Sequence, residues 1–142
     1  MSEWKVNNFE KSQFCQNYGC ILAGRFEGDR GIDNAYQIKN YPVYNDFLVE
    51  ITTNSDRIID FGISLDPKQI SSNELQLIRI FLTSFLNNKT LNSDVMDFVQ
   101  QNINQSVFQI CESRSIQFDL MHLWVGNIGG VPTILVAKNC PR

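Results

Sequence analysis

The chain has 142 residues, of which 43% are hydrophobic and 19% are charged, and its formal net charge is −3 at pH 7. This length suits one domain (1–142) with a substantial core, and the composition excludes an intrinsically disordered chain. No apolar run approaches the roughly 20 residues of a membrane-spanning helix, and the first residues do not form a secretory signal. We therefore expect a cytoplasmic protein that does not associate with a membrane.

The negative charge is concentrated in residues 27–66, which hold eight acidic and three basic residues and so carry −5. The rest of the chain carries +2. A surface that binds nucleic acid needs clustered Lys and Arg, so we expect no nucleic-acid partner. The acidic stretch suits a basic protein partner, although a solvated surface without any partner can have the same composition.

The first 18 residues mix aromatic and polar side chains, and we expect a short helix or an irregular cover over the core. Residues 20–26 and 35–39 are typical of strands. The link between them contains Gly28 and Gly31 among charged residues, which predicts a turn or loop. This link has neither the glycine spacing of a dinucleotide-binding fingerprint nor the lysine of a phosphate-binding loop.

Residues 47–53 and 57–65 are predicted to form a β-hairpin, because the link between them, N-S-D, is a turn sequence. Apolar and polar residues alternate in both arms, as expected when one face of a sheet meets the core and the other meets water. The alternation places Glu50 and Asp60 on the outward face, where they would contribute to an acidic surface.

The stretch 70–88 has the strongest pattern in the chain and is predicted to be a helix packed in the core. Ser71 and Glu74 form a capping-box sequence at its start. Apolar residues then recur at helical spacing over about half of the circumference, which suits packing on a sheet. A second helix is predicted for residues 93–104, where Asp94 favours the positive N-terminal end.

Three strands are predicted to close the chain, at residues 107–112, 116–125 and 131–138. Residues 126–130, G-N-I-G-G, are typical of a hairpin turn, although such a link can also bring backbone N–H groups close to an anion. The order of strands, two helices and strands is the α+β pattern. We therefore expect an antiparallel sheet of about five to seven strands with the two helices packed on one face.

Four cysteines, Cys15, Cys20, Cys111 and Cys140, are expected to be reduced thiols in a cytoplasmic protein. Cys15 and Cys20 have the spacing of half a zinc site, but the closely paired ligands of such sites are missing. We expect neither a metal nor another cofactor.

His122 is the only histidine, and the pattern places it on one strand face with Trp124 and other apolar residues. It is a candidate general base, alone or with Cys111, although such a residue more often has a structural role. No nucleophile or orienting group accompanies it in a known pattern, so we predict that the protein is not an enzyme. A small enzyme or ligand-binding domain with a pocket near His122 is one alternative to the leading hypothesis.

The leading hypothesis is a non-enzymatic bacterial immunity or inhibitor protein that neutralises a basic, nuclease-type toxin through an acidic face. A chaperone for a secretion effector is the other alternative, although the chain ends in predicted strands. The predicted partner-binding residues are acids of the 27–66 stretch and neighbouring tyrosines. They are Glu27, Asp29, Asp33, Tyr36, Tyr41, Tyr44, Asp46, Glu50 and Asp60.

Overall fold

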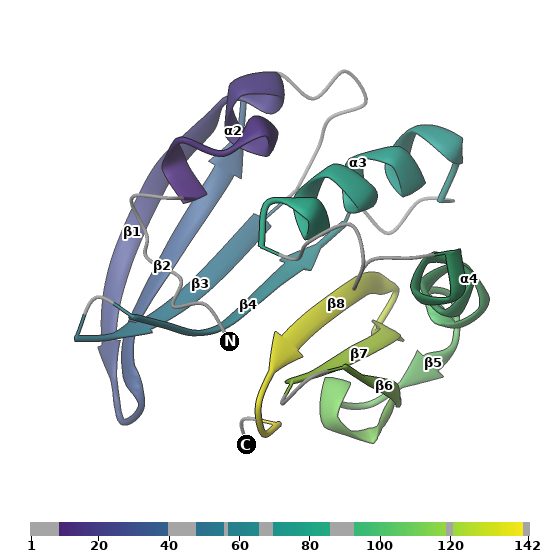
Figure 1. The fold of residues 1–142 in the computed structure, drawn as a ribbon. Helices are drawn as coiled ribbons and strands as arrows, with labels where there is room; N and C mark the ends of the chain where they lie inside the picture. The colour runs from purple at the N-terminus through teal and green to yellow at the C-terminus, as the bar shows by residue number, and fades with distance from the viewer. Residues whose placement is uncertain are drawn as a thin grey trace.

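The computed structural model of the chain describes residues 9–39, 48–55, 57–65, 70–85, 93–118 and 121–140. A short helix comes first, followed by four strands, two further helices and a final group of strands (Figure 1). In chain order the elements are α2 (Gln13–Tyr18), β1 (Cys20–Gly28), β2 (Gly31–Ile38), β3 (Leu48–Asn54), β4 (Arg57–Ser64), α3 (Ser72–Thr83), α4 (Ser93–Asn102), β5 (Ser106–Val107), η1 (Ile110–Glu112), β6 (Arg114–Phe118), β7 (Met121–Ile128) and β8 (Val131–Ala137). The predicted α+β class is confirmed.

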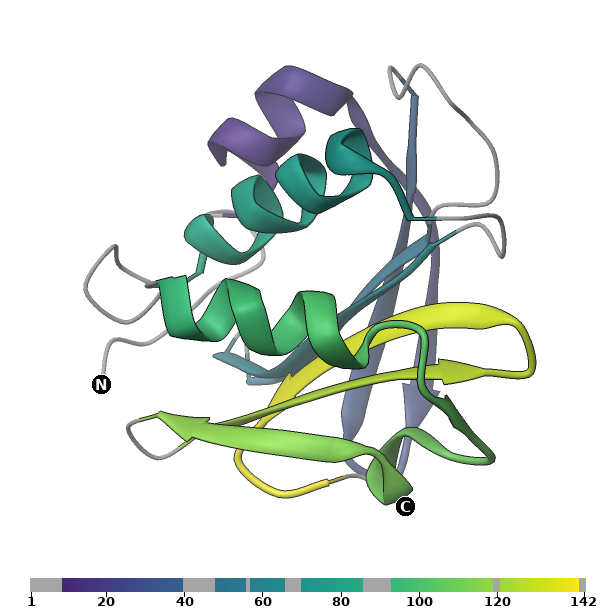
Figure 2. The ribbon, with the colours of Figure 1, turned by 90° about the vertical axis from the view of Figure 1, so that its right-hand side faces the viewer.

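The strands form one eight-stranded sheet in the order β1-β2-β3-β4-β8-β7-β5, and β6 also pairs with β7. All of these pairs are antiparallel except that of β5 with β7, which is parallel. The short strand β5 and the extra strand β6 therefore take the sheet beyond the expected five to seven strands. Strand direction turns strongly between β4 and β8, as the twist of a large sheet requires (Figure 2).

The hairpin of β3 and β4 forms as predicted, and alternate residues face opposite sides of the sheet. One side carries buried residues that belong to the hydrophobic core, and we call it the core face. On β3 and β4 these residues are Val49, Ile51, Phe61 and Ile63. We call the opposite side the outer face; it carries the intervening polar residues of the same strands, including Glu50, Thr52 and Asp60.

Helix α3 begins with the predicted capping box. The Ser71 hydroxyl accepts a hydrogen bond from the Asn73 N–H at 3.2 Å, and the Glu74 carboxylate accepts one from the Ser71 N–H at 2.8 Å. The helix ends at Thr83, and the end predicted at residue 88 lies outside the described residues. No helix in the described ranges is long and apolar enough to cross a membrane.

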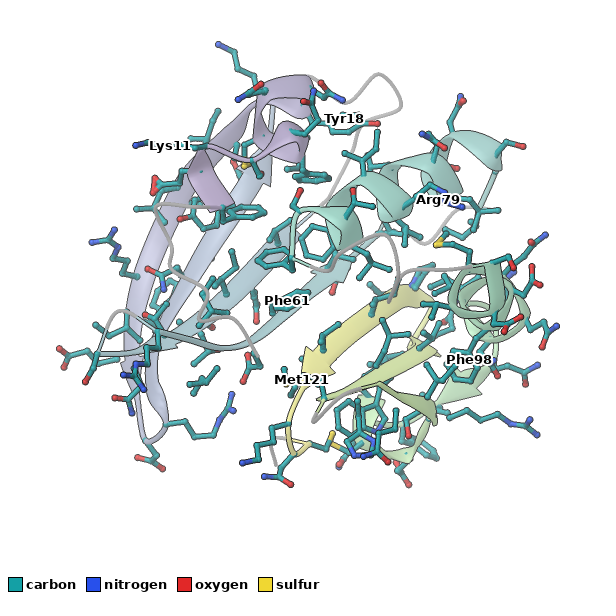
Figure 3. The ribbon with its side chains drawn as sticks, viewed as in Figure 1. Lys11, Tyr18, Phe61, Arg79, Phe98 and Met121 are labelled. Carbon is teal, nitrogen blue, oxygen red and sulfur yellow. A yellow bond between two sulfur atoms is a disulfide. The ribbon has the colours of Figure 1, made fainter. Side chains whose placement is uncertain are left out.

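Aromatic rings fill the space between α3 and the sheet. Figure 3 shows Phe61 pointing from β4 toward α3. The Phe81 ring lies with its centroid 5.3 Å from that of Phe14, which α2 contributes. Of the two forms expected for the N-terminal segment, a short helix or an irregular cover, its described part contains a helix that packs into the core.

The C-terminal part differs from the prediction in two places. Residues 107–112 are not a strand, because only the two-residue strand β5 forms before the 3₁₀ turn η1. The predicted long strand over 116–125 is the hairpin of β6 and β7. Ile116, expected on the same face as His122 and Trp124, pairs with Leu123 and therefore lies on the opposite face from His122. His122 and Trp124 do share a face of β7.

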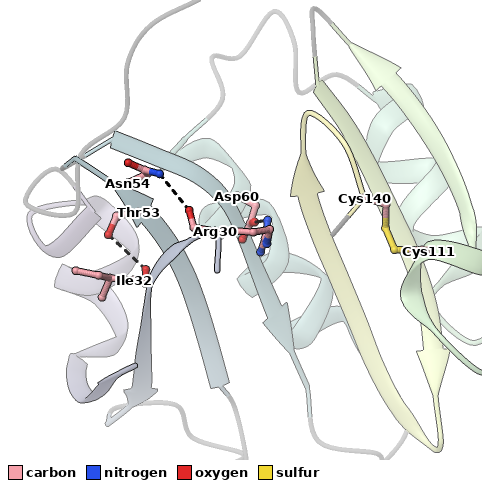
Figure 4. Close-up of polar contacts among 7 residues, drawn as sticks. All are labelled: Arg30, Ile32, Thr53, Asn54, Asp60, Cys111 and Cys140. Atoms are coloured by element: carbon pink, nitrogen blue, oxygen red, sulfur yellow. Dashed lines mark hydrogen bonds and ion pairs between the residues drawn. A yellow bond between two sulfur atoms is a disulfide. The ribbon is translucent and has the colours of Figure 1, made fainter. Parts of the chain in front are cut away.

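The cysteines form two disulfides, and the prediction of reduced thiols is wrong. Cys15 bonds Cys20 with a Cα separation of 4.9 Å, across the left-handed Gly19 that ends α2. Cys111 of η1 bonds Cys140 after β8, with a Cα separation of 5.7 Å (Figure 4). The second pair joins positions that lie 29 residues apart in sequence and meet only in the folded sheet.

Candidate functional site

A pocket of about 490 Å³ lies on the outer face of the sheet. Residues of β2, β3, β4, β7 and β8 line it, together with the turn between β1 and β2 and the nearby η1. Four carboxylates and one guanidinium face this pocket, which gives a net charge of −3 at neutral pH. They belong to Asp29, Asp33, Glu50, Asp60 and Arg30.

Strand register brings three of these carboxylates together. Asp33 on β2 and Asp60 on β4 each lie directly opposite Thr52 on β3. Glu50 lies two residues before Thr52 and therefore on the same face. Because neighbouring strands are about 4.8 Å apart, the three residues lie within about 10 Å of one another.

Small residues beside Glu50 leave space at the centre of the pocket. Ala35 and Gly62 lie directly opposite Glu50 on the two neighbouring strands. A Cβ atom at Gly62 would lie 2.8 Å from the carbonyl oxygen of Ile134, so β8 approaches β4 closely only because glycine stands there. Because its neighbours are small, Glu50 stays accessible to solvent although it lines the pocket.

Arg30 closes one side of the pocket through an ion pair. Its Nη1 donates a hydrogen bond to Asp60 Oδ2 at 2.6 Å (Figure 4). The Asp60 side chain is only 7% exposed and that of Arg30 is 45% exposed. A buried carboxylate is costly without a partner, so Arg30 stabilises Asp60 in place. Asp60 lies on the predicted face, where it is buried and paired with Arg30.

The turn that carries Arg30 is held tightly on β3. Asn54 donates a hydrogen bond from Nδ2 to the Arg30 carbonyl at 3.2 Å, and the Thr53 hydroxyl donates one to the Ile32 carbonyl at 3.4 Å (Figure 4). Gly31 has a φ of 148°, and a Cβ atom there would lie 2.1 Å from the Thr53 carbonyl oxygen. Only glycine fits this position.

Replacing Gly31 by alanine should therefore displace the turn and separate Arg30 from Asp60. We expect the free energy of unfolding to fall by at least about 2 kcal/mol in urea denaturation. Gly28→Ala in the same turn is the matched control, because its Cβ atom would meet nothing closer than 3.8 Å. Equal losses in the two variants would contradict the close approach of the turn to β3.

The pocket raises the pKa of two carboxyl groups. Burial raises the pKa of Asp33, and the charge of Asp60 raises it further, while Arg30 lowers it. Partial desolvation in the pocket also raises the pKa of Glu50, although the residue stays accessible to solvent, and the charges of Asp33 and Asp60 add to this effect. Asp33 Oδ1 is buried and has no hydrogen-bond partner among the described residues. The pocket thus holds negative charge that Arg30 does not fully neutralise.

These raised pKa values predict a pH dependence of stability. The folded state binds the protons of Asp33 and Glu50 more tightly than the unfolded state, so their ionisation destabilises the fold. This cost is present above their raised pKa values and disappears as pH falls below the ordinary values of 3.8 and 4.5. We expect Glu50→Gln to raise the free energy of unfolding at pH 7 and to lose this advantage near pH 4.

Urea denaturation at the two pH values measures the effect of Glu50→Gln. Asp97→Asn, an exposed acid on α4, removes the same charge away from the pocket and serves as control. An advantage of Glu50→Gln that does not change with pH would rule out the raised pKa as its cause.

The structure brings together four of the nine predicted partner-binding residues, Asp29, Asp33, Glu50 and Asp60. Glu27 is exposed on β1 and does not line the pocket. The predicted residues Tyr41, Tyr44 and Asp46 lie outside the described residues.

Tyr36, another predicted partner-binding residue, lies on the core face and away from the pocket. It is 1% exposed and lies opposite Val49 on the core face, with its ring 5.2 Å from that of Phe9. Burial raises its pKa to about 12, and the charge of the nearby Glu10 contributes. Its environment is that of a core residue.

The pocket lining also includes residues that the sequence did not single out. Some offer hydroxyl groups and others offer apolar surface, which suits a ligand that combines a cationic head with an aliphatic stem. They include Thr52, Ser64, Thr133, Ile110, Ile128 and Leu135. For Thr52, Ser64, Thr133 and Leu135 the only sequence signal was strand alternation, which does not say which strands become neighbours.

His122, the central residue of the alternative site, does not belong to the acidic pocket. His122 lies beside Trp124, with ring centroids 5.4 Å apart, and neither residue lines the acidic pocket. Cys111 is in a disulfide and is not a thiol partner for His122. Within the described ranges, no group of three or more His, Cys, Asp or Glu residues has a metal-binding arrangement. Compared with protein-family models, curated proteins and solved structures, the chain matches none.

Proposed function

We propose that the protein is a non-enzymatic binding protein whose pocket holds a cationic side chain of a basic protein partner. The observation that carries this proposal is the convergence of Asp33 and Glu50 beside the Arg30–Asp60 ion pair. Burial and mutual repulsion make their negative charge costly, as the raised pKa values indicate. A guanidinium or ammonium group would compensate that charge through charge-assisted hydrogen bonds.

A bacterial immunity or inhibitor protein directed at a basic, nuclease-type toxin fits this chemistry. Such a toxin has a cationic surface that binds phosphates, and an acidic inhibitor would associate with it rapidly. The two disulfides favour an oxidising compartment, because disulfides persist poorly in the reducing cytosol. We therefore include an oxidising location in the proposal, in place of the cytoplasmic one expected from the sequence.

Calorimetric titration with an oligoarginine peptide tests the proposal. Glu50→Lys should weaken binding by at least about tenfold, because a charge in the pocket is reversed and not merely removed. Asp97→Lys makes the same change in net charge on exposed α4 and should weaken binding much less. Equal weakening by both variants would mean that the peptide senses only the overall charge, and the pocket proposal would fail.

The size of the pocket supports a second candidate, a domain that binds a small organic cation. A volume of about 490 Å³ lies within the range of roughly 300–1,000 Å³ typical of small-molecule sites. Titration with spermidine separates the two candidates. The small-cation candidate predicts that spermidine binds saturably, that Glu50→Lys abolishes this binding, and that oligoarginine binds no more tightly than spermidine. Tighter binding of oligoarginine would favour the protein partner.

A further inference from the structure

Strand β1 forms an edge of the sheet and has a segment that is open to pairing. It pairs with β2 on one side, and no strand in the described part of the chain pairs with its other side. Edge strands usually carry Lys, Pro or a covering segment that prevents association. This nine-residue strand contains neither Lys nor Pro, and most of it is exposed. Phe26, the middle residue of the regularly paired segment 24–28, is 61% exposed.

The second half of β1 is the part with regular geometry. A bulge between Leu22 and Gly24 disturbs the register with β2, but from Gly24 to Gly28 the pairing is continuous. Alternate residues of an edge strand direct their N–H and C=O groups toward the free side. The regular segment therefore offers a short hydrogen-bonding edge with the sequence G-R-F-E-G.

This segment is complementary to itself in the antiparallel direction. When two copies are aligned about Phe26, the two Phe26 side chains face each other. Arg25 of each copy then lies opposite Glu27 of the other, and each Gly24 lies opposite a Gly28. Opposite charges and aromatic pairs directly across two strands are stabilising, whereas like charges are destabilising. No charged residue in this alignment meets one of the same sign.

The faces of the strand also agree with this alignment. Phe26 lies opposite Asp33 and so belongs to the outer face, whereas Arg25 and Glu27 point to the other side of the sheet. The Phe26 ring leans over Gly24, as shown by the distance of only 2.9 Å between the ring and a Cβ atom built at Gly24. Glycines on both sides of the aromatic pair thus leave room for the two rings.

We propose that β1 is a self-association surface, and that two copies of the chain pair their β1 strands antiparallel about Phe26. The two sheets then become continuous across the dimer. Glu27, an acid that the pocket does not use, binds Arg25 of the second copy. This inference does not depend on the proposed function of the pocket.

Sedimentation equilibrium of the full chain, in a concentration series up to about 1 mM, tests the dimer, since an edge contact of this size is expected to be weak. Arg25→Glu and Glu27→Arg should each weaken dimerisation at least about tenfold, because like charges then face each other twice. The double variant R25E/E27R restores opposite charges and should restore the dimer. Thermal unfolding should leave the Tm of each variant near that of the unchanged chain at low concentration, since both residues are exposed.

Two further variants make the result decisive. Lys138→Glu is exposed after β8, changes the net charge as Arg25→Glu does, and should not affect dimerisation. Phe26→Ser should weaken the dimer without a change of charge. A monomer at every concentration, single charge variants that dimerise normally, or a double variant that stays monomeric would each overturn the proposal.

Discussion

Replacing Phe81 by alanine is expected to lower the free energy of unfolding by about 3–5 kcal/mol, because it would leave a large cavity in the middle of the core. Phe81 is fully buried on α3. Its ring centroid lies 5.3 Å from that of Phe14, 5.9 Å from Phe61, 5.3 Å from Phe85 and 6.2 Å from Phe9. Phe14 belongs to α2 and Phe61 to β4, while Phe9 precedes α2 and Phe85 follows α3. Phe81 therefore joins parts of the chain that are distant in sequence. Urea denaturation followed by circular dichroism measures the loss.

Phe108→Ala is the matched control for this variant. Phe108 is 90% exposed, so removing its ring should change the free energy of unfolding by no more than about 0.5 kcal/mol. Losses of similar size at the two positions would show that the aromatic cluster does not stabilise the core as described.

Removing the disulfide between Cys111 and Cys140 is expected to destabilise the fold by about 3–4 kcal/mol in the chain-entropy model. This bond joins residues separated by 29 positions, so it restricts the unfolded chain strongly. The bond between Cys15 and Cys20 spans only 5 positions, and its removal should cost about 2 kcal/mol. The variants C111S/C140S and C15S/C20S should therefore differ measurably in urea denaturation under oxidising conditions.

The order of these two losses is the informative result. A larger loss in C15S/C20S would mean that its bond stabilises the folded state directly, beyond its effect on the unfolded chain. Thiol titration of the denatured, unreduced protein provides a check, because no thiol should react when both bonds have formed. Reaction of four thiols would mean that the bonds are absent in solution.

Local patterns predicted the parts of the fold that depend on neighbouring residues. The capping box at Ser71 and the helical spacing that follows it specify α3, and the alternation on either side of N-S-D specifies β3 and β4. The link between β6 and β7 contains neither Gly nor Pro, and alternation continues on both sides of it. The sequence pattern was therefore indistinguishable from that of one long strand.

The candidate site could be predicted only in part. The concentration of acids was visible, but register alone places Asp33 and Asp60 on either side of Thr52. Arg30 reaches Asp60 across 30 residues of sequence, so their pairing had no local signal. Tyr36 was expected at a partner surface, but alternation along β2 places its side chain in the core opposite Val49. The pairing of Cys111 with Cys140 likewise had no local signal, because 29 positions separate them.

An NMR titration of isotope-labelled protein with an oligoarginine peptide tests the central proposal most directly, because it locates the bound peptide on the chain. We predict saturable shifts of amide signals around Asp33, Glu50 and Gly62, which weaken as salt concentration rises. Asp94 and Asp97 on α4 carry acidic charge away from the pocket and should shift little. Shifts that are as large on α4 as around Glu50, or no shifts at all, would contradict a cation-binding pocket on the outer face.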